Sequence, residues 1–88
     1  MNVEPWSIEI ERRADRDLER LDRQVRDRVL SSIENLAANP EQANIRRLTN
    51  RPESRLRVGN WRVIFTIDHA RRTVSVRRVL LREHAYAR

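Results

Sequence analysis

SRLRVGNWRVIFTID, residues 54–68, consists of two alternating segments joined by Gly59-Asn60. Apolar and polar residues alternate on both sides of the Gly-Asn pair, which is the pattern of half-buried β-strands. Glycine at the first central position of a two-residue loop is typical of a tight hairpin turn. The stretch therefore predicts a β-hairpin with strands at 54–58 and 61–68.

The two-residue turn fixes which residues face each other across the hairpin. Val58 should pair with Trp61, and Arg57 with Arg62, since pairing continues outward from the turn. Successive side chains of a strand point to opposite faces. One face, which we expect to be the core, then carries Leu56, Val58, Trp61, Val63, Phe65 and Ile67. The opposite face carries Arg55, Arg57 and Arg62.

The pair of arginines on the polar face is unusual for a sheet. Like charges directly opposite each other destabilise a sheet by a few tenths to about 1 kcal/mol. A polyanion supplies a reason for them, because three planar guanidinium groups on one rigid surface can bind a phosphate backbone. The alternative is that the three side chains simply extend into water.

The N-terminal half predicts a strand followed by two helices. Trp6, Ile8 and Ile10 alternate with polar residues, which predicts a half-buried strand. From about Arg13 the apolar residues recur at helical spacing, with Asp22 as the N-cap of the second helix. These helical positions are Ala14, Leu18 and Leu21, then Val25, Val29, Ile33 and Leu36. The second helix ends at AANP, because a residue before proline disfavours helical geometry.

Two segments flank the hairpin. Residues 40–54 predict a connecting loop with one turn near Ile45–Leu48, and Leu48 is expected to anchor the loop to the core. Residues 73–81 predict a third strand after a turn at His69–Arg72. The apolar residues of this strand change parity at Arg77–Arg78, so we expect a β-bulge there.

The predicted order is β-α-α-β-β-β, an α+β fold with a helical hairpin on one face of an antiparallel-rich sheet. A length of 88 residues fits one domain, residues 1–88. The chain has no cysteine, which excludes disulfides and fits a cytoplasmic location. No apolar run exceeds three residues, so a transmembrane helix is not expected.

The charge is strongly uneven along the chain. The net charge is +6, and all 19 basic residues are arginine, a composition that coding bias can also produce. Residues 1–44 carry seven arginines and ten acidic residues, whereas residues 45–88 carry twelve arginines and three acidic residues. A basic half of this kind is typical of a protein that binds a polyanion.

The C-terminal segment LREHAYAR, residues 81–88, adds further polar candidates. By parity across the bulge, one of Arg77 and Arg78, and then Arg82, should join the arginine face. His84 is the most conventional acid–base residue of the chain. Tyr86 either packs the C-terminus against the core, or reaches the arginine face to stack on a base or transfer a proton.

Four stretches together resemble the RelE branch of the RelE/ParE toxin superfamily of type II toxin–antitoxin systems. They are ADRDLERL, VLSSIENLAANP, RLRVGNWRVIFTID and VSVRRVLLREHAY. The third is the most specific, since it is similar to the arginine-rich hairpin of that family. The resemblance covers nearly the whole chain and implies the RelE-like microbial ribonuclease fold.

The resemblance also implies an activity and a set of site residues. RelE toxins are endoribonucleases, many of which cut messenger RNA on the ribosome by attack of a ribose 2′-hydroxyl on the adjacent phosphate. No metal or other cofactor takes part. Carried over by position, the family's active-site residues fall on Arg55, Arg57, Arg62, Arg82 and Tyr86. We predict Arg57, Arg62, Arg82 and Tyr86 as catalytic and Arg55 as substrate-binding. Arg78 and His84 are added as substrate-binding residues from the charge pattern and the C-terminal segment. The implied partners are an antitoxin with an acidic binding segment, messenger RNA and the ribosome.

Two other functions are alternatives, and the proton acceptor is open. A ParE-like gyrase poison shares the fold, but ParE-like chains usually lack this set of arginines and the terminal tyrosine, which argues against it. A non-catalytic module could bind RNA or DNA through the same arginines. Arginine stays protonated, so it is a poor general base. His84, Tyr86 or a ribosomal group would accept the proton, or catalysis would rest on positioning and charge.

Overall fold

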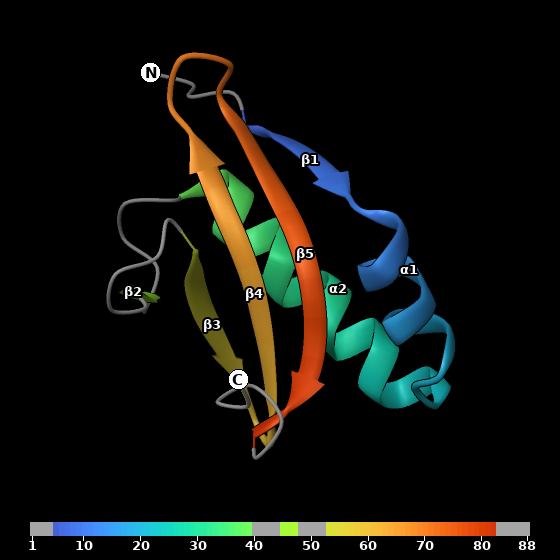
Figure 1. Ribbon diagram of the computed structural model, residues 1–88. Helices are drawn as coiled ribbons and strands as arrows, with labels where there is room; N and C mark the ends of the chain where they lie inside the picture. The colour runs from blue at the N-terminus through green and yellow to red at the C-terminus, as the bar shows by residue number, and fades with distance from the viewer. Residues whose placement is uncertain (1–4, 40–44, 48–52, 83–88) are drawn as a thin grey trace.

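The described part of the molecule is a mixed five-stranded sheet with two helices, seen in Figure 1. The computed structural model describes residues 5–39, 45–47 and 53–82, and for 45–47 only the backbone. The elements are β1 (Ser7–Ile10), α1 (Arg12–Glu19), α2 (Arg23–Ala38), β2 (Ile45–Arg47), β3 (Ser54–Val58), β4 (Trp61–Asp68) and β5 (Thr73–Leu81). The strand order is β1-β5-β4-β3-β2, with β1 parallel to β5 and the other pairs antiparallel.

The hairpin predicted from residues 54–68 is confirmed in its bounds and register. Val58 lies opposite Trp61, and Arg57 lies opposite Arg62. Gly59 has a φ of 59°, in the left-handed region that a tight hairpin turn requires at this position. The local turn chemistry therefore set the register of the two strands.

The β-bulge predicted in β5 is also confirmed. Ile64 lies opposite Arg78 and Phe65 opposite Val76, so Arg77 is the extra residue. A bulge shifts the alternation of a strand by one residue. The shift lets Val76 and Val79 both face the core although they are three residues apart.

The segment expected to be a loop contains a short strand. β2 pairs antiparallel with β3, with Ile45 opposite Leu56. The prediction of a turn near Ile45–Leu48 was wrong for residues 45–47. Three residues carry too little periodicity to mark a strand, and the edge of β3 induces the pairing. Leu48 lies outside the described residues.

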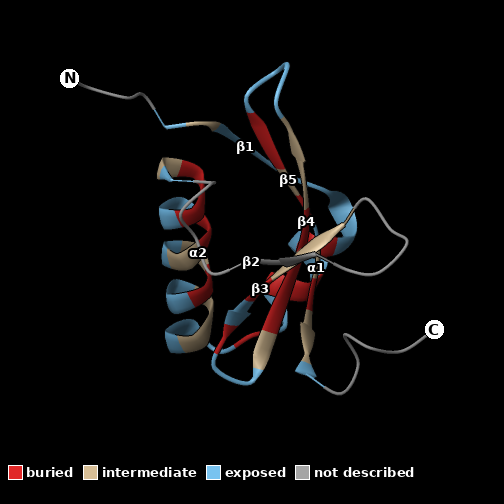
Figure 2. Cartoon of the chain, turned by 90° about the vertical axis from the view of Figure 1, so that its left-hand side faces the viewer, coloured by how far each residue is buried: buried red, intermediate tan, exposed pale blue. Residues whose placement is uncertain are grey.

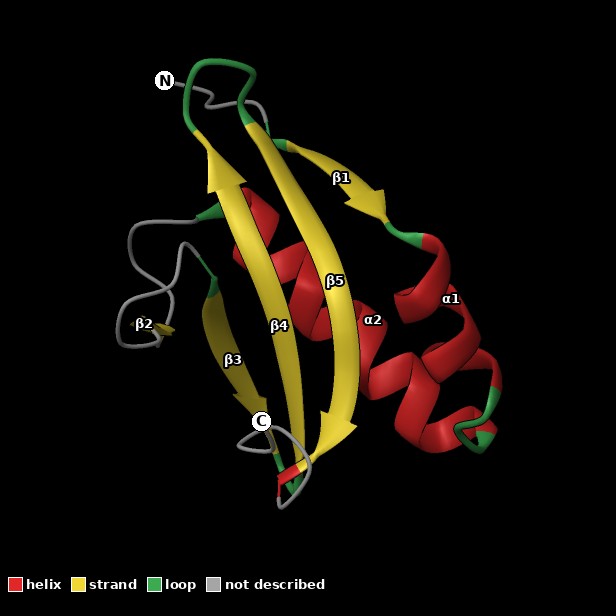
Figure 3. Cartoon of the chain, viewed as in Figure 1, coloured by secondary structure: helices red, strands yellow, loops and turns green. Residues whose placement is uncertain are grey.

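The two helices are joined by a short, tightly held link. The Asp22 carboxylate accepts a hydrogen bond from the Val25 amide at 3.0 Å, which confirms Asp22 as an N-cap. The Arg26 guanidinium donates to the carbonyls of Leu18 (3.2 Å) and Leu21 (3.0 Å). Figure 3 shows α2 crossing behind the sheet, while α1 lies beside β5. Neither helix is long and apolar enough to cross a membrane.

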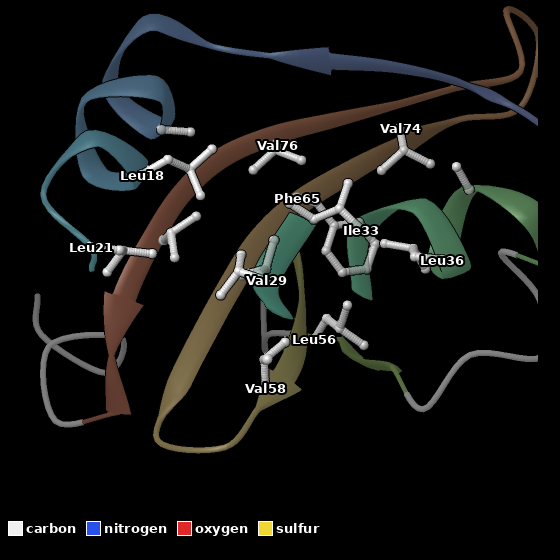
Figure 4. Packing of buried hydrophobic residues seen from close by; sticks show 14 residues of the cluster. Leu18, Leu21, Val29, Ile33, Leu36, Leu56, Val58, Phe65, Val74 and Val76 are labelled. Carbon is white, nitrogen blue, oxygen red and sulfur yellow. The ribbon is translucent and has the colours of Figure 1, made fainter. Parts of the chain in front are cut away.

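The core lies between α2, α1 and one face of the sheet. Figure 2 shows the buried side of α2 turned toward the strands. The largest fully buried side chains are those of Phe65, Ile33, Leu36, Val29, Val63, Val74, Val76 and Val79. Phe65 of the central strand lies against Ile33 in Figure 4. Of the predicted core residues, Trp61 and Ile67 are only partly buried.

The first strand is less buried than its alternation predicts. All four residues of β1 are exposed, with Ile8 at 36% and Ile10 at 37%. β1 is an edge strand with a neighbour on one side only. Trp6, just before the strand, is the residue that packs against the core. The expectation of a half-buried strand was therefore wrong for β1.

Candidate nucleic-acid interface

Three of the predicted site residues meet around the turn between β3 and β4. Arg57 and Arg62 are direct partners across the hairpin. Arg82 follows the end of β5, and its backbone N–H donates to the Asn60 carbonyl at 2.8 Å. Arg55 lies further from the turn, opposite Ile64. The sheet thus brings together three arginines that are up to 25 positions apart in the sequence.

These arginines differ greatly in their exposure. Arg57 and Arg82 are exposed and Arg55 is half-buried, whereas Arg62 is only 3% exposed. Nη1 of Arg62 donates to the carbonyls of Gly59 and Trp61, both at 2.9 Å. The expectation that the hairpin guanidinium groups all point outward was wrong for Arg62. The reason is that the neighbouring turn offers the side chain carbonyl partners.

Arg78 does not join the arginines at the turn. Its Nε lies 2.8 Å from Asp17 Oδ2, and its Nη2 lies 3.2 Å from Asp17 Oδ1. The hydrogen bonds to this carboxylate raise the pKa of Arg78 above its ordinary value. The sequence could not show that α1 carries an acid to this point. Two nitrogens of its guanidinium, Nε and Nη2, thus bind Asp17, and the assignment of Arg78 to substrate binding stays a prediction.

Asp17 is a buried polar residue that the sequence analysis missed. Besides Arg78, its Oδ2 accepts the backbone N–H of Val79 at 2.9 Å. β1 pairs with β5 only as far as Val76, so the carboxylate supplies an acceptor where the neighbouring strand has ended. The sequence did contain a sign of this buried acid, because Asp17 lies on the same side of α1 as the buried apolar residues Ala14 and Leu18.

Besides Arg78, two described arginines of the sheet and its loops form ion pairs with acids. Arg77 Nε lies 3.4 Å from Glu11 Oε2, and Arg77 Nη1 lies 3.2 Å from Glu53 Oε2. Arg71 Nη2 lies 3.3 Å from Glu9 Oε2. In contrast, no ion pair within the described residues involves Arg57, Arg62 or Arg82. The turn end of the hairpin therefore carries three arginines whose charge no acid of the described residues balances.

The arrangement can bind and stabilise an anion, but its arginines cannot accept a proton. Two exposed guanidinium groups at a rigid turn suit a phosphate diester. His84 and Tyr86, which the sequence analysis predicts as site residues, lie outside the described residues. Within the part of the chain that the structure describes, no group of three His, Cys, Asp or Glu side chains could hold a metal ion.

Residues 8–86 match the family of ParE toxins of type II toxin–antitoxin (parDE) systems. The chain belongs to the ParE toxin family. This family is part of the RelE/ParE superfamily, so the resemblance seen in the sequence is confirmed at that level. The ParE family match makes the protein the toxin of a type II toxin–antitoxin system.

Solved structures of RelE toxins share the fold of this ParE-family chain. The toxin–antitoxin complex RelBE2 from Mycobacterium tuberculosis matches with a TM-score of 0.82 and 24% identity over 92% of this chain and 95% of that one. The RelE–RelB complex from Pyrococcus horikoshii matches with a TM-score of 0.76 and 19% identity, over 90% and 97%. The Escherichia coli RelBE complex matches with a TM-score of 0.72 and 18% identity, over 86% of this chain and 95% of that one. No curated protein sequence matches the chain. At these identities the likeness establishes the α+β fold.

Proposed function

We propose that this toxin is a metal-independent endoribonuclease that cleaves messenger RNA on the ribosome and so inhibits translation. The observation that carries the proposal is the arginine group at the hairpin turn. Arg57 and Arg82 are exposed there, and neither belongs to an ion pair of the described residues. The likeness in fold to RelE toxins supports the same reaction class.

The reaction needs a positive surface beside one phosphate. The ribose 2′-oxygen attacks the adjacent phosphorus, the bond from phosphorus to the 5′-oxygen breaks, and a 2′,3′-cyclic phosphate remains. The transition state carries extra negative charge on the phosphate oxygens. Arg57 and Arg82 stabilise that charge, and Arg55 orients the RNA backbone. Removing one such contact costs about 10²- to 10³-fold in rate.

The proton steps fall to the C-terminal segment. The 2′-hydroxyl loses a proton as it attacks, and the leaving 5′-oxygen gains one. Tyr86 and His84 are the groups of the chain suited to these transfers. Tyr86→Phe and His84→Gln should each lower cleavage more than RNA binding if they transfer protons.

The implied partner is an antitoxin with an acidic binding segment. RelE toxins of similar fold were solved as complexes with RelB antitoxins. With a net charge of +6, the toxin attracts an acidic polypeptide. A messenger RNA target places the action in the cytoplasm.

The proposal is tested by inducing the toxin in cells and mapping the 5′ ends of messages. We expect new ends within translated codons, and Arg57→Gln should reduce their frequency at least about 100-fold. The matched control is Arg12→Gln, which removes an exposed arginine of α1. Binding of messages without new ends would instead indicate a non-catalytic module.

A gyrase poison is the second candidate, because the matching family is that of ParE toxins. Such a toxin would leave messages intact and trap double-strand DNA breaks. New 5′ ends of messages and double-strand DNA breaks can both be measured in the same cultures. Trapped breaks with intact messages would replace the ribonuclease proposal.

A further inference from the structure

Arg28 brings a further guanidinium to the hairpin turn from the helical layer. This residue belongs to α2 and is exposed. A Cβ added at Gly59 would meet its Nη1 at 3.7 Å, so the end of the side chain lies close to the backbone of the turn. Arg28 and Gly59 are 31 positions apart, and no periodicity of the chain predicts their approach. Arg28 was therefore not among the predicted site residues.

Gly59 is a neighbour of both Arg28 and Arg62. Its carbonyl accepts a hydrogen bond from Arg62 Nη1 at 2.9 Å. With the covalent dimensions of one residue, these two contacts place the two Nη1 atoms within about 10 Å of each other. A polyanion bound by the arginines of the hairpin therefore passes within reach of Arg28.

No acid balances Arg28 among the described residues. None of their ion pairs includes it. Helical ion pairs form between residues three or four positions apart. For Arg28 these positions hold the uncharged residues Gln24, Val25, Ser31 and Ser32. Arg23, in contrast, has Asp27 four positions ahead on the same helix face. The charge of Arg28 is thus available to an anion that approaches from solvent.

Arg28 approaches the turn from the side opposite to the other site arginines. α2 covers the core face of the sheet, as seen in Figure 2. Val58 and Val63 lie on that face, and Arg57 and Arg62 alternate with them, so the two arginines start from the other face. One phosphate bound on the arginine face is therefore not the same phosphate that Arg28 meets beyond the turn.

We propose, on the basis of the ribonuclease function proposed above, that Arg28 binds an RNA phosphate that flanks the scissile one. The RNA strand then runs from the arginines of the sheet across the hairpin turn toward α2. Gly59 and Asn60 are both exposed, so the surface between the two groups is accessible to the strand. A guanidinium and a phosphate form charge-assisted hydrogen bonds, and such a contact positions the strand without reading its bases.

The first test measures RNA binding by Arg28→Gln. The probe is a dodecanucleotide that carries the cleavage sequence mapped in cells, with 2′-deoxyribose at the cleavage position. Its dissociation constant is measured at several salt concentrations. Each lost phosphate contact lowers the steepness of log K against log salt by about 0.7. We expect this loss in Arg28→Gln, and a steepness equal to that of the wild type would overturn the proposal.

The matched controls are Arg23→Gln and Arg28→Lys. Arg23 is an exposed arginine of the same helix, about 140° around its axis from Arg28, so its loss should leave the salt dependence unchanged. Lysine keeps the charge, so Arg28→Lys should keep most of the steepness. Glutamine and lysine are good helix formers, and the variants should therefore fold. An equal loss in Arg23→Gln would reduce the effect to net charge and contradict a specific contact.

A neutral methylphosphonate, placed at one position of the RNA at a time, identifies the phosphate that Arg28 binds. In Arg28→Gln, the replacement of that phosphate should have no further effect, because the contact is already lost. We expect this non-additivity at a phosphate beside the cleavage position, whereas Arg57→Gln should show it at the cleavage position. Non-additivity of Arg28→Gln at the scissile phosphate, or at none, would contradict the flanking assignment.

The two proposals fail in different ways. If the wild-type toxin neither binds nor cleaves RNA, the ribonuclease proposal fails and the role of Arg28 with it. If the wild type cleaves RNA and Arg57→Gln lowers cleavage, while Arg28→Gln binds RNA as Arg23→Gln does, only the role of Arg28 is wrong.

Discussion

Asp17 shows how one side chain can join two elements. Its carboxylate binds the Arg78 fork and the Val79 amide, and only 9% of the residue is exposed. Buried carboxylates are tolerated when charged and hydrogen-bonding partners surround them. Asp17 meets that condition and fixes α1 against the bulged part of β5.

Replacing Asp17 by Asn should lower the free energy of unfolding by about 2 kcal/mol. The amide keeps one oxygen for Val79 but loses the charge that binds Arg78. Asp17 raises the pKa of Arg78, and arginine without this contact is also protonated throughout this range, so the loss should be the same at pH 7 and pH 9. Urea denaturation measures the loss in the free energy of unfolding. The control is Glu19→Gln, a substitution at an exposed residue of the same helix. Equal stability of both variants would show that the Asp17 contacts contribute nothing.

Among the elements, the β3–β4 hairpin depends most on neighbouring residues for its geometry. Its register follows from a two-residue turn, and Gly59 takes the left-handed backbone conformation that this turn needs. A Cβ at Gly59 would meet Arg28 Nη1 at 3.7 Å, an ordinary contact. The need for glycine there is therefore a matter of backbone conformation and not of space.

Gly59→Ala should destabilise the protein by about 1–2 kcal/mol, because alanine is strained in the left-handed region. Gly59→Asn should cost less than half of that, since asparagine tolerates this conformation. Thermal unfolding of both variants provides the comparison. If Asn were as damaging as Ala, space or a lost contact would be the cause instead of backbone strain.

The whole molecule depends on a small core built from both layers. A chain of this size has a total stability of about 5–10 kcal/mol. Phe65 is fully buried in the central strand and contacts the α2 layer, so it connects the sheet with the helices. Phe65 is therefore the large side chain of β4 through which the sheet packs on α2.

Phe65→Ala should cost about 3–5 kcal/mol, a large part of the total stability. Ile10→Ala, at a residue that is 37% exposed on the edge strand, should cost less than about 1 kcal/mol. The two are compared by chemical denaturation monitored by far-UV circular dichroism. Similar losses in both variants would mean that the core is not centred on β4.

Several features could be predicted from the residues: the α+β class, the hairpin register, the bulge at Arg77 and the N-cap at Asp22. Each depends on contacts between neighbours in the chain or on strict alternation, which a linear sequence records. β2 could not be predicted, because its three residues become a strand only through the edge of β3. The exposure of Ile8 and Ile10 could not be predicted either, because alternation does not reveal which strand lies at an edge.

For the candidate site, the sequence by itself determined the cluster of arginines and the opposition of Arg57 and Arg62. Only the tertiary structure decided which of them are available to a ligand. It joined Arg78 to Asp17 across 61 positions and turned Arg62 inward to the hairpin carbonyls. The physical reason is that a guanidinium binds the nearest suitable acceptor in three dimensions, and the identity of that acceptor depends on how distant segments pack.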